Sequence, residues 1–237
     1  MDSMSETATG RAHDVVLRHI ENSLRSGELK LGDRLPGERA LAEQFGISRA
    51  SVRDAIRSLE VLGVLRSATG SGPNSGTIVV SDPSSALGVA LRMHVASHHL
   101  PVNDVVEARI MMETWSLEHA AAAPWTPDQL DDARRLLDAM DDDALPSQIF
   151  TLLDAQFHVA LSALAGNVVV STMMESLREA IRGYIDDAVT RRGGWDAAVH
   201  VLREHHRGIF EAVEARDGER SARLVREHIE WFYRQAL

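Results

Sequence analysis

The sequence predicts a mainly α-helical protein with an N-terminal winged helix-turn-helix domain and a C-terminal antiparallel bundle of six or seven helices. Within residues 1–80, helical patterns of apolar residues are followed by two short β-branched runs, which is the element order of a winged helix-turn-helix. From residue 86 onward, apolar residues recur only at helical spacing. At about 150 residues per domain, a chain of 237 residues suggests two domains.

We divide the chain into a disordered tail (1–10), a winged helix-turn-helix domain (11–80), a linker (81–85) and a helical domain (86–237). The tail is small and polar, and the linker is rich in Ser, Asp and Pro. Cysteine is absent, which excludes disulfide bonds and thiolate metal ligands. Neither a membrane span nor a signal peptide is present in the sequence, so we expect a cytoplasmic protein with no membrane partner.

The winged domain begins with a helix predicted for residues 13–24. Its apolar residues lie on one side of the helix: Val16, Leu17, Ile20 and Leu24. Glycines then turn the chain, and Pro36 with Gly37 opens a second, short helix over residues 38–45.

A third helix, predicted for residues 48–62, is the element around which this domain is organised. Ser48 is a good N-cap, and Gly63 is a stop signal. The apolar stripe of the helix consists of Val52, Ala55, Ile56, Leu59 and Leu62, and a neighbouring cationic stripe consists of Arg49, Arg53 and Arg57. With the preceding helix and turn it predicts a helix-turn-helix whose last helix enters the DNA major groove. The alternative interpretation is that these arginines only form a solvated surface and do not bind DNA.

Two short runs, residues 64–65 and 77–80, predict a hairpin after the third helix. The wing between them, residues 69–76, is rich in Gly and Ser, and no Lys or Arg occurs between Ser67 and Ala90. A charged contact from the wing tip to the minor groove is therefore not expected, although backbone N–H groups could approach phosphate.

The clearest motif in the first domain is the run Leu35-Pro36-Gly37-Glu38-Arg39, followed at fixed spacing by Leu41-Ala42, Gly46-Ile47-Ser48-Arg49, Val52-Arg53, Ala55-Ile56 and Leu59. In residue type and spacing it resembles the signature of the GntR family of bacterial transcription regulators. The resemblance implies a homodimer that binds a palindromic operator in double-stranded DNA. This chain departs from the family pattern at the wing, which in other members is usually shorter and carries a basic residue. The DNA-binding candidates are Arg39, Ser48, Arg49, Ser51 and Arg53.

The second domain contains several clear helix boundaries. Thr126-Pro127-Asp128-Gln129 is a helix start, with an N-cap, a proline at the first position and a glutamine three residues after the cap. Pro146 opens a helix that Gly166-Asn167 closes, and two more helices follow the breaks at 193–194 and 217–218.

One carboxylate and three imidazoles in this domain form a candidate site for a divalent metal. Asp154 and His158 are four residues apart and so lie on one face of a helix. His206 and His228 lie in the last two predicted helices. This ligand set suits a borderline divalent cation and leaves room in an octahedral shell for water or a carboxylate. Since the chain has 11 histidines, ordinary surface or core histidines are the alternative.

The wider pattern consists of Asp154-x-x-Phe157-His158, Ala165-Gly166-Asn167, His206-x-x-Ile209 and His228. It resembles the all-helical FCD effector domain of the FadR-like branch of the GntR family. The resemblance implies a metal bound by Asp154, His158, His206 and His228, which in turn holds a small carboxylate effector. We name zinc, with nickel, manganese or iron as alternatives. The family usually has Glu-His where this chain has His205-His206, and the spacing to Ile209 and Ala212 selects His206.

Three further residues are candidates for binding the effector. Arg109 matches a family arginine that faces the effector pocket, and a guanidinium pairs well with a carboxylate. An ion pair with Glu113 within the same helix is an equal alternative. Asn167 either lines the pocket or ends its helix in the left-handed conformation. Arg182 is a candidate of the same kind as Arg109.

The net charge of −10 belongs entirely to the second domain. Residues 1–80 contain ten basic and ten acidic residues, whereas residues 81–237 contain 15 basic and 25 acidic ones. The proposed DNA-binding helix is locally cationic, and the acidic second domain would be repelled by DNA.

We therefore predict a ligand-responsive DNA-binding transcription regulator, a repressor and not an enzyme. Binding of the effector would change the placement of the two DNA-binding heads. Two alternatives stay open: a metal-dependent enzyme acting on a small organic acid, and a regulator whose metal only stabilises the bundle. No separate general base or nucleophile motif is recognisable in the sequence.

Overall fold

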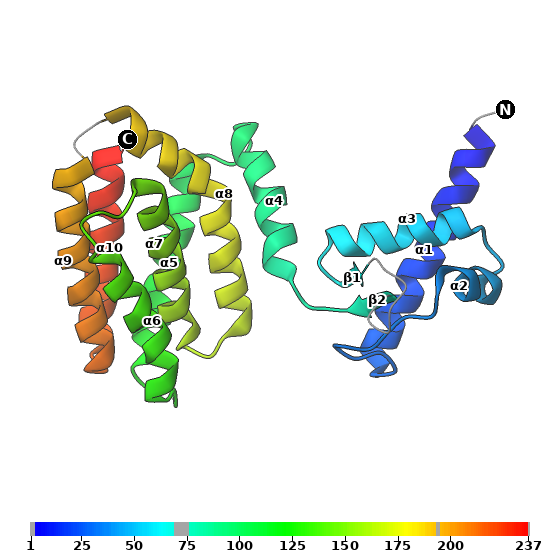
Figure 1. Ribbon diagram of the computed structural model, residues 1–237, viewed down its shortest axis with the longest axis horizontal. Helices are drawn as coiled ribbons and strands as arrows, with labels where there is room; N and C mark the ends of the chain where they lie inside the picture. Colours follow the sequence, from blue (N-terminus) through cyan, green and yellow to red (C-terminus); the bar gives the residue numbers. More distant parts are fainter. Residues whose placement is uncertain (1–2, 69–75, 193–194, 237) are drawn as a thin grey trace. The chain divides into compact units, whose positions relative to one another are not determined.

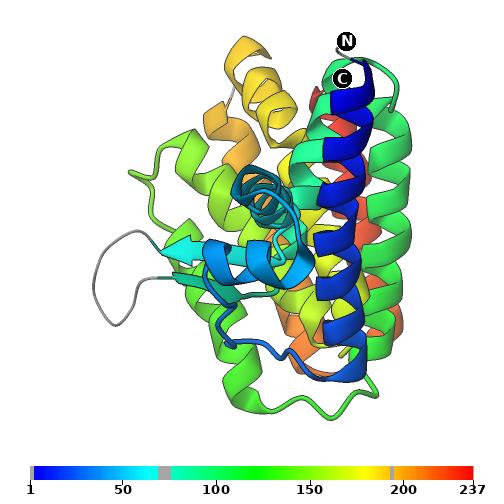
Figure 2. The ribbon, with the colours of Figure 1, turned by 90° about the vertical axis from the view of Figure 1, so that its right-hand side faces the viewer.

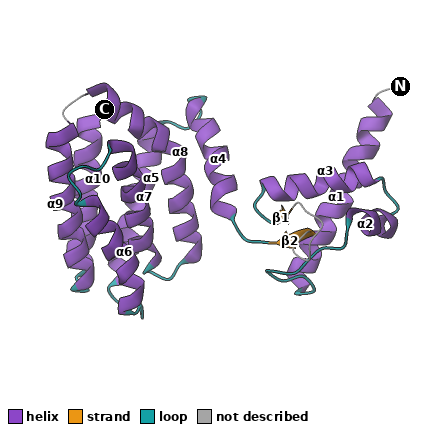
Figure 3. Ribbon diagram, in the orientation of Figure 1, coloured by secondary structure: helices purple, strands orange, loops and turns teal. Residues whose placement is uncertain are grey.

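A computed structural model of the protein describes residues 3–68, 76–192 and 195–236. The chain forms two compact units, Met1–Ala86 and Leu87–Leu237. The predicted fold class is confirmed, because the described residues form helices apart from one small hairpin and the connecting turns (Figure 3). Within the described ranges, no helix is long and apolar enough to cross a membrane.

The N-terminal unit has the element order of a winged helix-turn-helix (Figure 1). Its elements are α1 (Ser3–Ser26), α2 (Glu38–Phe45), α3 (Arg49–Val61), β1 (Leu65–Ala68) and β2 (Gly76–Val79). The two strands are antiparallel, with Leu65 opposite Val79 and Ala68 opposite Gly76, and they lie side by side in Figure 2.

The apolar stripe of α3 forms the core of this unit. Val52, Ala55, Ile56 and Leu59 are buried with Val16 and Ile20 of α1 and Leu41 of α2. Leu62, which we predicted to continue the stripe, is 54% exposed because α3 ends before it. Gly63 is required at the next position: its φ is 69°, and a Cβ there would lie 2.0 Å from the carbonyl oxygen of Asp82.

Two predicted irregular segments contain helix. Helix α1 starts at Ser3, inside the segment that we predicted to be a disordered tail, because extending an existing helix adds one hydrogen bond per residue without a new nucleation step. Helix α4 starts at Pro83, inside the predicted linker, and proline is well tolerated in a first helical turn. Residues 69–75, to which the prediction of a non-basic wing applies, lie outside the described residues.

Seven helices, α4–α10, make up the described chain after residue 82, in agreement with the predicted bundle. They are α4 (Pro83–Ala96), α5 (Val102–Ala120), α6 (Pro127–Met140), α7 (Ser147–Ala163), α8 (Val168–Arg192), α9 (Trp195–Glu214) and α10 (Gly218–Ala236). The predicted start of α6 is present: the side-chain oxygen of Gln129 accepts the backbone N–H of Thr126 at 2.8 Å.

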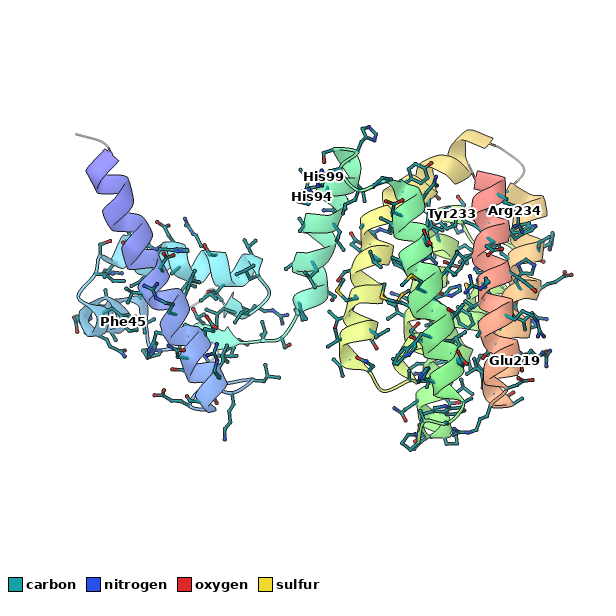
Figure 4. All side chains as sticks on the ribbon, turned by 180° about the vertical axis from the view of Figure 1, so that it is seen from behind. Phe45, His94, His99, Glu219, Tyr233 and Arg234 are labelled. Carbon is teal, nitrogen blue, oxygen red and sulfur yellow. The ribbon has the colours of Figure 1, made fainter. Side chains whose placement is uncertain are left out.

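Helix α7 is central to the bundle, where it packs against α5, α6 and α8, while α10 packs against α5 and α9. The largest buried side chains of α7, Phe150, Phe157 and Leu161, belong to one core with Ile209 of α9 and Ile229 of α10. Figure 4 shows α10 from behind, with Glu219 near its first turn and Tyr233 and Arg234 near its last. This packing directs one face each of α5, α7, α8, α9 and α10 toward the interior.

Candidate metal centre and DNA-binding surface

Four side chains from three helices converge inside the C-terminal unit. Asp154 and His158 are one turn apart on α7, His206 comes from α9, and His228 comes from α10. The three histidines are at most 4% exposed, whereas the side chain of Asp154 is 21% exposed. One ligand atom from each residue lies within 4.8 Å of the others. The structure thus brings together the four residues that the sequence nominated as metal ligands.

The Oδ1 atom of Asp154 faces all three histidines. It lies 2.9 Å from Nε2 of His206, 3.6 Å from Nε2 of His158 and 4.0 Å from Nε2 of His228. Metal–ligand bonds of about 2.0–2.2 Å allow two atoms bound to one ion to be at most about 4.4 Å apart. The four ligand atoms, all within 4.8 Å of one another, therefore exceed this limit by at most about 0.4 Å, so small side-chain movements would bring every pair within it.

Glu113 of α5 orients His158 from behind. The Nδ1 atom of His158 donates to Oε2 of Glu113 over 2.7 Å, so Nε2 is the nitrogen that faces Asp154. A carboxylate in this position fixes the tautomer of a metal-binding histidine and strengthens it as a ligand. Arg178 of α8 holds the two carboxylates together, with 2.9 Å to Oδ2 of Asp154 and 3.1 Å to Oε1 of Glu113.

The electrostatics of this buried network favour ionised carboxylates at Asp154 and Glu113 and neutral imidazoles at His206 and His228. Burial favours the neutral acids, but Arg178 and His158 outweigh it and hold the pKa values of Asp154 and Glu113 well below their usual range. Burial lowers the pKa of His206 and of His228. Ionised carboxylates and neutral imidazoles are the forms that bind divalent ions.

Several buried nitrogens of this group have no hydrogen-bonding partner in the described part of the chain: Nε2 of His158, Nδ1 and Nε2 of His206, and Nδ1 of His228. The Nε2 atom of His206 lies 2.9 Å from Oδ1 of Asp154, an ion-pair distance, and neither ring nitrogen of His206 has a hydrogen-bonding partner in the described residues. Unpaired buried polar atoms are rare in folded proteins, and an imidazole lone pair that faces a carboxylate oxygen is satisfied by a cation between them. The donor set therefore fits a divalent metal.

A small cavity of about 20 Å³ adjoins the group, and its polar wall includes Arg109, Asp154, His228 and Tyr233. Arg109 is 3% exposed. It donates from Nε and NH2 to Glu113, at 3.1 and 2.9 Å, and from NH1 to the hydroxyl of Tyr233 at 3.0 Å. Arg109 thus forms the predicted pair with Glu113 within α5 and also lines the cavity, while its role in binding an effector stays a prediction.

Asn167 does not line this cavity. Its side chain is exposed, and its Oδ1 accepts the backbone N–H groups of Val169 and Val170 at 3.1 and 3.2 Å, so it caps the start of α8. Gly166, with a φ of 75°, takes the left-handed position that we had considered for Asn167.

Arg182 also lies away from the cavity. Its side chain is 44% exposed and pairs with Glu179 at 3.1 Å. Four residues advance a helix by about 400°, so Arg182 is rotated about 40° from Arg178, toward solvent. Arg178, and not Arg182, is the arginine of α8 that reaches the buried carboxylates.

His205 is close to the group but is not part of it. Its ring centroid lies 5.3 Å from that of Trp231 and 5.7 Å from that of His228. The spacing argument that selected His206 over His205 agrees with this placement.

Sequence reasoning missed the roles of Glu113, Arg178 and Tyr233. Glu113 and Arg178 each interrupt a buried apolar stripe. Glu113 lies one turn before the buried Leu117 on α5, and Arg178 directly follows the buried Leu177 on α8. An ionisable residue on an apolar helical face was the available signal, because such a residue is buried only with a partner. Nothing in the local sequence distinguishes Tyr233 from an ordinary aromatic residue of an amphipathic helix.

The DNA-binding candidates divide into exposed and buried ones. The side chains of Arg39 and Arg49 are 82% and 62% exposed. Ser48 caps α3 by accepting the backbone N–H of Ser51 at 3.0 Å. Ser51 is only 5% exposed, and its hydroxyl lies 3.0 Å from that of Ser48, so it belongs to the helix cap and is not placed to contact DNA.

Glu38 of α2 partly neutralises the cationic face of α3. Arg53 donates from Nε and NH2 to the two carboxylate oxygens, at 3.0 and 2.9 Å, and Arg49 lies 3.8 Å away. The hydrogen bond from Arg53 is the main cause that lowers the pKa of Glu38. Arg53 is thereby held across the gap between the two helices of the helix-turn-helix.

Comparison with known proteins finds two family matches. Residues 13–73 match the family described as bacterial regulatory proteins, gntR family. Residues 104–230 match the FCD domain. The first match includes the larger part of α1, all of α2 and α3, and the first strand of the N-terminal unit, and the second includes all four converging side chains.

Full-length relatives agree with these matches. The uncharacterized HTH-type transcriptional regulator YcbG of Bacillus subtilis is 30% identical over 217 residues, covering 91% of this chain and 86% of YcbG. The HTH-type transcriptional repressor NanR of Cronobacter sakazakii is 26% identical, covering 94% and 84%. The structure of Streptococcus agalactiae GntR has the same fold, with a TM-score of 0.62 and 24% identity over 94% of this chain and 97% of that one.

Proposed function

This chain belongs to the GntR family of bacterial regulatory proteins and carries an FCD domain, and from that premise we propose that it is a repressor whose operator affinity is set by a small carboxylate bound at a metal centre in the C-terminal unit. The repressor role draws support from the relative NanR, which is named a transcriptional repressor. The protein acts in the cytoplasm as a homodimer and has no catalytic role.

The observation that carries the proposal is the convergence of Asp154, His158, His206 and His228, with buried ring nitrogens that lack hydrogen bonds. Nitrogen and oxygen donors of this kind fit zinc, and also nickel, manganese or iron. When bound, the ion supplies positive charge and coordination positions for an anion. Arg109 and Tyr233, on the wall of the same cavity, donate N–H and O–H groups to a carboxylate oxygen.

The N-terminal unit supplies the DNA contact. Helix α3 enters the major groove, and the two copies in a homodimer read the two halves of a palindromic operator. Arg49 and Arg53 contact bases and phosphates, Arg39 contacts the backbone, and Ser48 positions the start of the helix. Affinity falls with rising salt, because each arginine that reaches a phosphate releases counterions.

A chain of hydrogen bonds connects the cavity to several helices. Tyr233 of α10, Arg109 and Glu113 of α5, and Arg178 of α8 are linked one to the next. The residue after Arg178, Glu179, pairs with Arg92 of α4 at 2.8 Å. A carboxylate that engages Arg109 more strongly in one arrangement of these helices than in another shifts their populations, and α4 leads along the chain to the DNA-binding unit.

The burial of the three histidines also fits a metal that only stabilises the bundle. Such a metal raises the melting temperature, whereas organic acids leave it unchanged. A metal-dependent enzyme, in turn, converts the acid that it binds. A sensor returns it unchanged, so recovery of the added acid after incubation with metal-loaded protein separates these two functions.

The decisive experiment measures the metal and the DNA response in the same proteins. Elemental analysis is expected to find about one metal per chain in the wild type and in His205→Ala, and none in His206→Ala. His205→Ala is the matched control because it removes the adjacent imidazole on α9. Fluorescence anisotropy with an operator selected from random duplexes then tests whether carboxylates release the protein from DNA. We expect release in the wild type and in His205→Ala, and no release in His206→Ala. Equal metal content in His206→Ala and the wild type would contradict the proposal.

A further inference from the structure

The cavity beside the four converging residues has an apolar end as well as a polar wall. Six apolar side chains from α7, α8, α9 and α10 line it: Phe150, Ile185, Trp195, Leu202, Ile229 and Phe232. The polar wall holds Arg109, Thr151, Asp154, His228 and Tyr233. A ligand that fills both parts must therefore be polar at one end and apolar at the other.

Phe150 connects the two ends. Its ring stacks on that of His206 with centroids 6.0 Å apart, and it meets the ring of Trp195 edge to face at 5.3 Å. Phe150 is only 1% exposed, whereas Trp195, at the start of α9, is half-buried. An aromatic surface thus extends from a candidate metal ligand to the outer part of the cavity.

The cavity offers about 20 Å³, which is room for about one water molecule. A larger ligand has to displace side chains. Phe150, Leu202 and Ile229 are at most 3% exposed and fixed in the core. The half-buried Ile185, Trp195 and Phe232 can turn aside with less loss of packing. If these three side chains move, the apolar side chains of Phe150, Leu202 and Ile229 remain as lining of the enlarged cavity.

We propose that the effector is a monocarboxylate that bears a branched aliphatic or aromatic group. Its carboxylate binds beside Arg109 and Tyr233, and its apolar group occupies the end formed by Ile185, Trp195 and Phe232. The inference rests on the proposed function, since it takes a small carboxylate to be the ligand. Sugar acids and dicarboxylates are disfavoured, because their hydroxyl groups or second charge would be buried against apolar side chains without partners.

The test compares acids of matched charge and different side chains by isothermal titration calorimetry on metal-loaded, full-length protein. Phenylacetate and 3-methylbutanoate represent the proposed class, acetate lacks the apolar group, and glucuronate and succinate represent the polar classes. We expect the first two to bind at least about 10-fold more tightly than the other three, since each buried methylene or larger apolar group contributes about that much.

Two tryptophans provide the variant and its control. Trp195→Ala is expected to lower the affinity for phenylacetate at least about 10-fold and to leave that for acetate unchanged. Trp231 is the matched control: it is also half-buried, and its ring centroid lies 5.3 Å from that of His205, as that of Trp195 does from Phe150, but it lies outside this cavity. Trp231→Ala should therefore change neither the affinity for phenylacetate nor that for acetate. Ile185→Ser serves as a second variant if Trp195→Ala does not fold. Metal content should stay equal in all of them.

The outcomes separate this inference from the proposed function. Glucuronate or succinate binding as tightly as phenylacetate would overturn the apolar class and leave a carboxylate sensor standing. A loss of phenylacetate affinity that is equal in Trp195→Ala and Trp231→Ala would also overturn it, because the effect would not be specific to the cavity. Binding of none of the five acids to metal-loaded wild-type protein would contradict the proposed function itself.

Discussion

Glu38 and Glu113 each bind two arginines, but the two clusters have opposite environments. Glu38 lies on the surface of the N-terminal unit, and the side chains in its cluster with Arg49 and Arg53 are 31–62% exposed. Glu113 lies inside the C-terminal unit, and the side chains in its cluster with Arg109 and Arg178 are at most 4% exposed. The same pairing of residue types is therefore solvated in one unit and dry in the other.

This difference in solvation separates two uses of arginine. An exposed ion pair contributes little to stability, because water and salt screen it. Arg49 and Arg53 can therefore leave Glu38 for a DNA phosphate at small cost. In the buried cluster no water replaces a lost partner, so Arg109 and Arg178 stay paired and hold Glu113 and Asp154 in fixed positions. The surface cluster suits exchange of partners, and the buried cluster suits orientation of a site.

The largest effect is expected from removal of the buried glutamate. Glu113→Ala leaves Arg109 and Arg178 without their shared carboxylate and should lower the unfolding free energy of the C-terminal unit by about 3–5 kcal/mol. Urea denaturation followed by tryptophan fluorescence measures this unit alone, because all four tryptophans lie at positions 115, 125, 195 and 231. Glu38→Ala should leave the same curve unchanged. A loss below about 1 kcal/mol for Glu113→Ala would mean that water reaches the cluster.

A smaller change at the same position tests the orientation of His158. Glu113→Gln keeps the size of the side chain and one acceptor oxygen but removes the charge, and should lower metal affinity about 10- to 100-fold in chelator competition. Glu179→Gln is the control, since Glu179 also pairs with two arginines, Arg92 and Arg182, but is 32% exposed. Equal affinities in the two variants would show that Glu113 does not act on the metal ligands.

The two units also differ in how far the sequence predicts them. The helix-turn-helix follows from local signals, namely the N-cap at Ser48, the apolar stripe of α3 and the left-handed glycine at position 46. That Asp154 and His158 share one face of a helix was predictable because four residues complete about one helical turn, whereas their choice as metal ligands was implied by the resemblance to the FCD domain. His206 was distinguished from His205 because neighbouring residues on a helix point about 100° apart.

The remaining features depend on contacts that the sequence does not encode locally. Ser51 is polar and stands near the start of α3, yet its hydroxyl faces the cap and not DNA. Arg178 and Arg182 are one turn apart on α8, and the sequence alone does not show that the first is buried while the second, rotated about 40° toward solvent, is exposed. The apolar end of the cavity joins residues from four helices, so no single segment predicts it.

An effect of intermediate size is expected from pH. Burial lowers the pKa of His206 and of His228 below the ordinary value of 6.5. Below pH 6.5 these histidines bind protons in the unfolded chain but not in the folded, metal-free unit. The unfolding free energy of the unit therefore falls as the pH falls, by at most about 1.4 kcal/mol per histidine and pH unit. Melting by tryptophan fluorescence at pH 7.5 and 5.5 should show the decrease, and His228→Phe should show a smaller one. A melting temperature that is unchanged or higher at pH 5.5 would contradict this.

The smallest effect is expected at the surface cluster. Glu38→Gln removes a negative charge beside Arg49 and Arg53, and so should raise the affinity for DNA of arbitrary sequence a few-fold, which anisotropy measures at several salt concentrations. Arg49→Ala should act in the opposite direction and make the salt dependence shallower by about one unit. If Glu38 instead positions Arg53 for a base contact, Glu38→Gln lowers operator affinity while affinity for arbitrary DNA rises. A fall in both affinities would contradict the view that Glu38 competes with phosphate for these arginines.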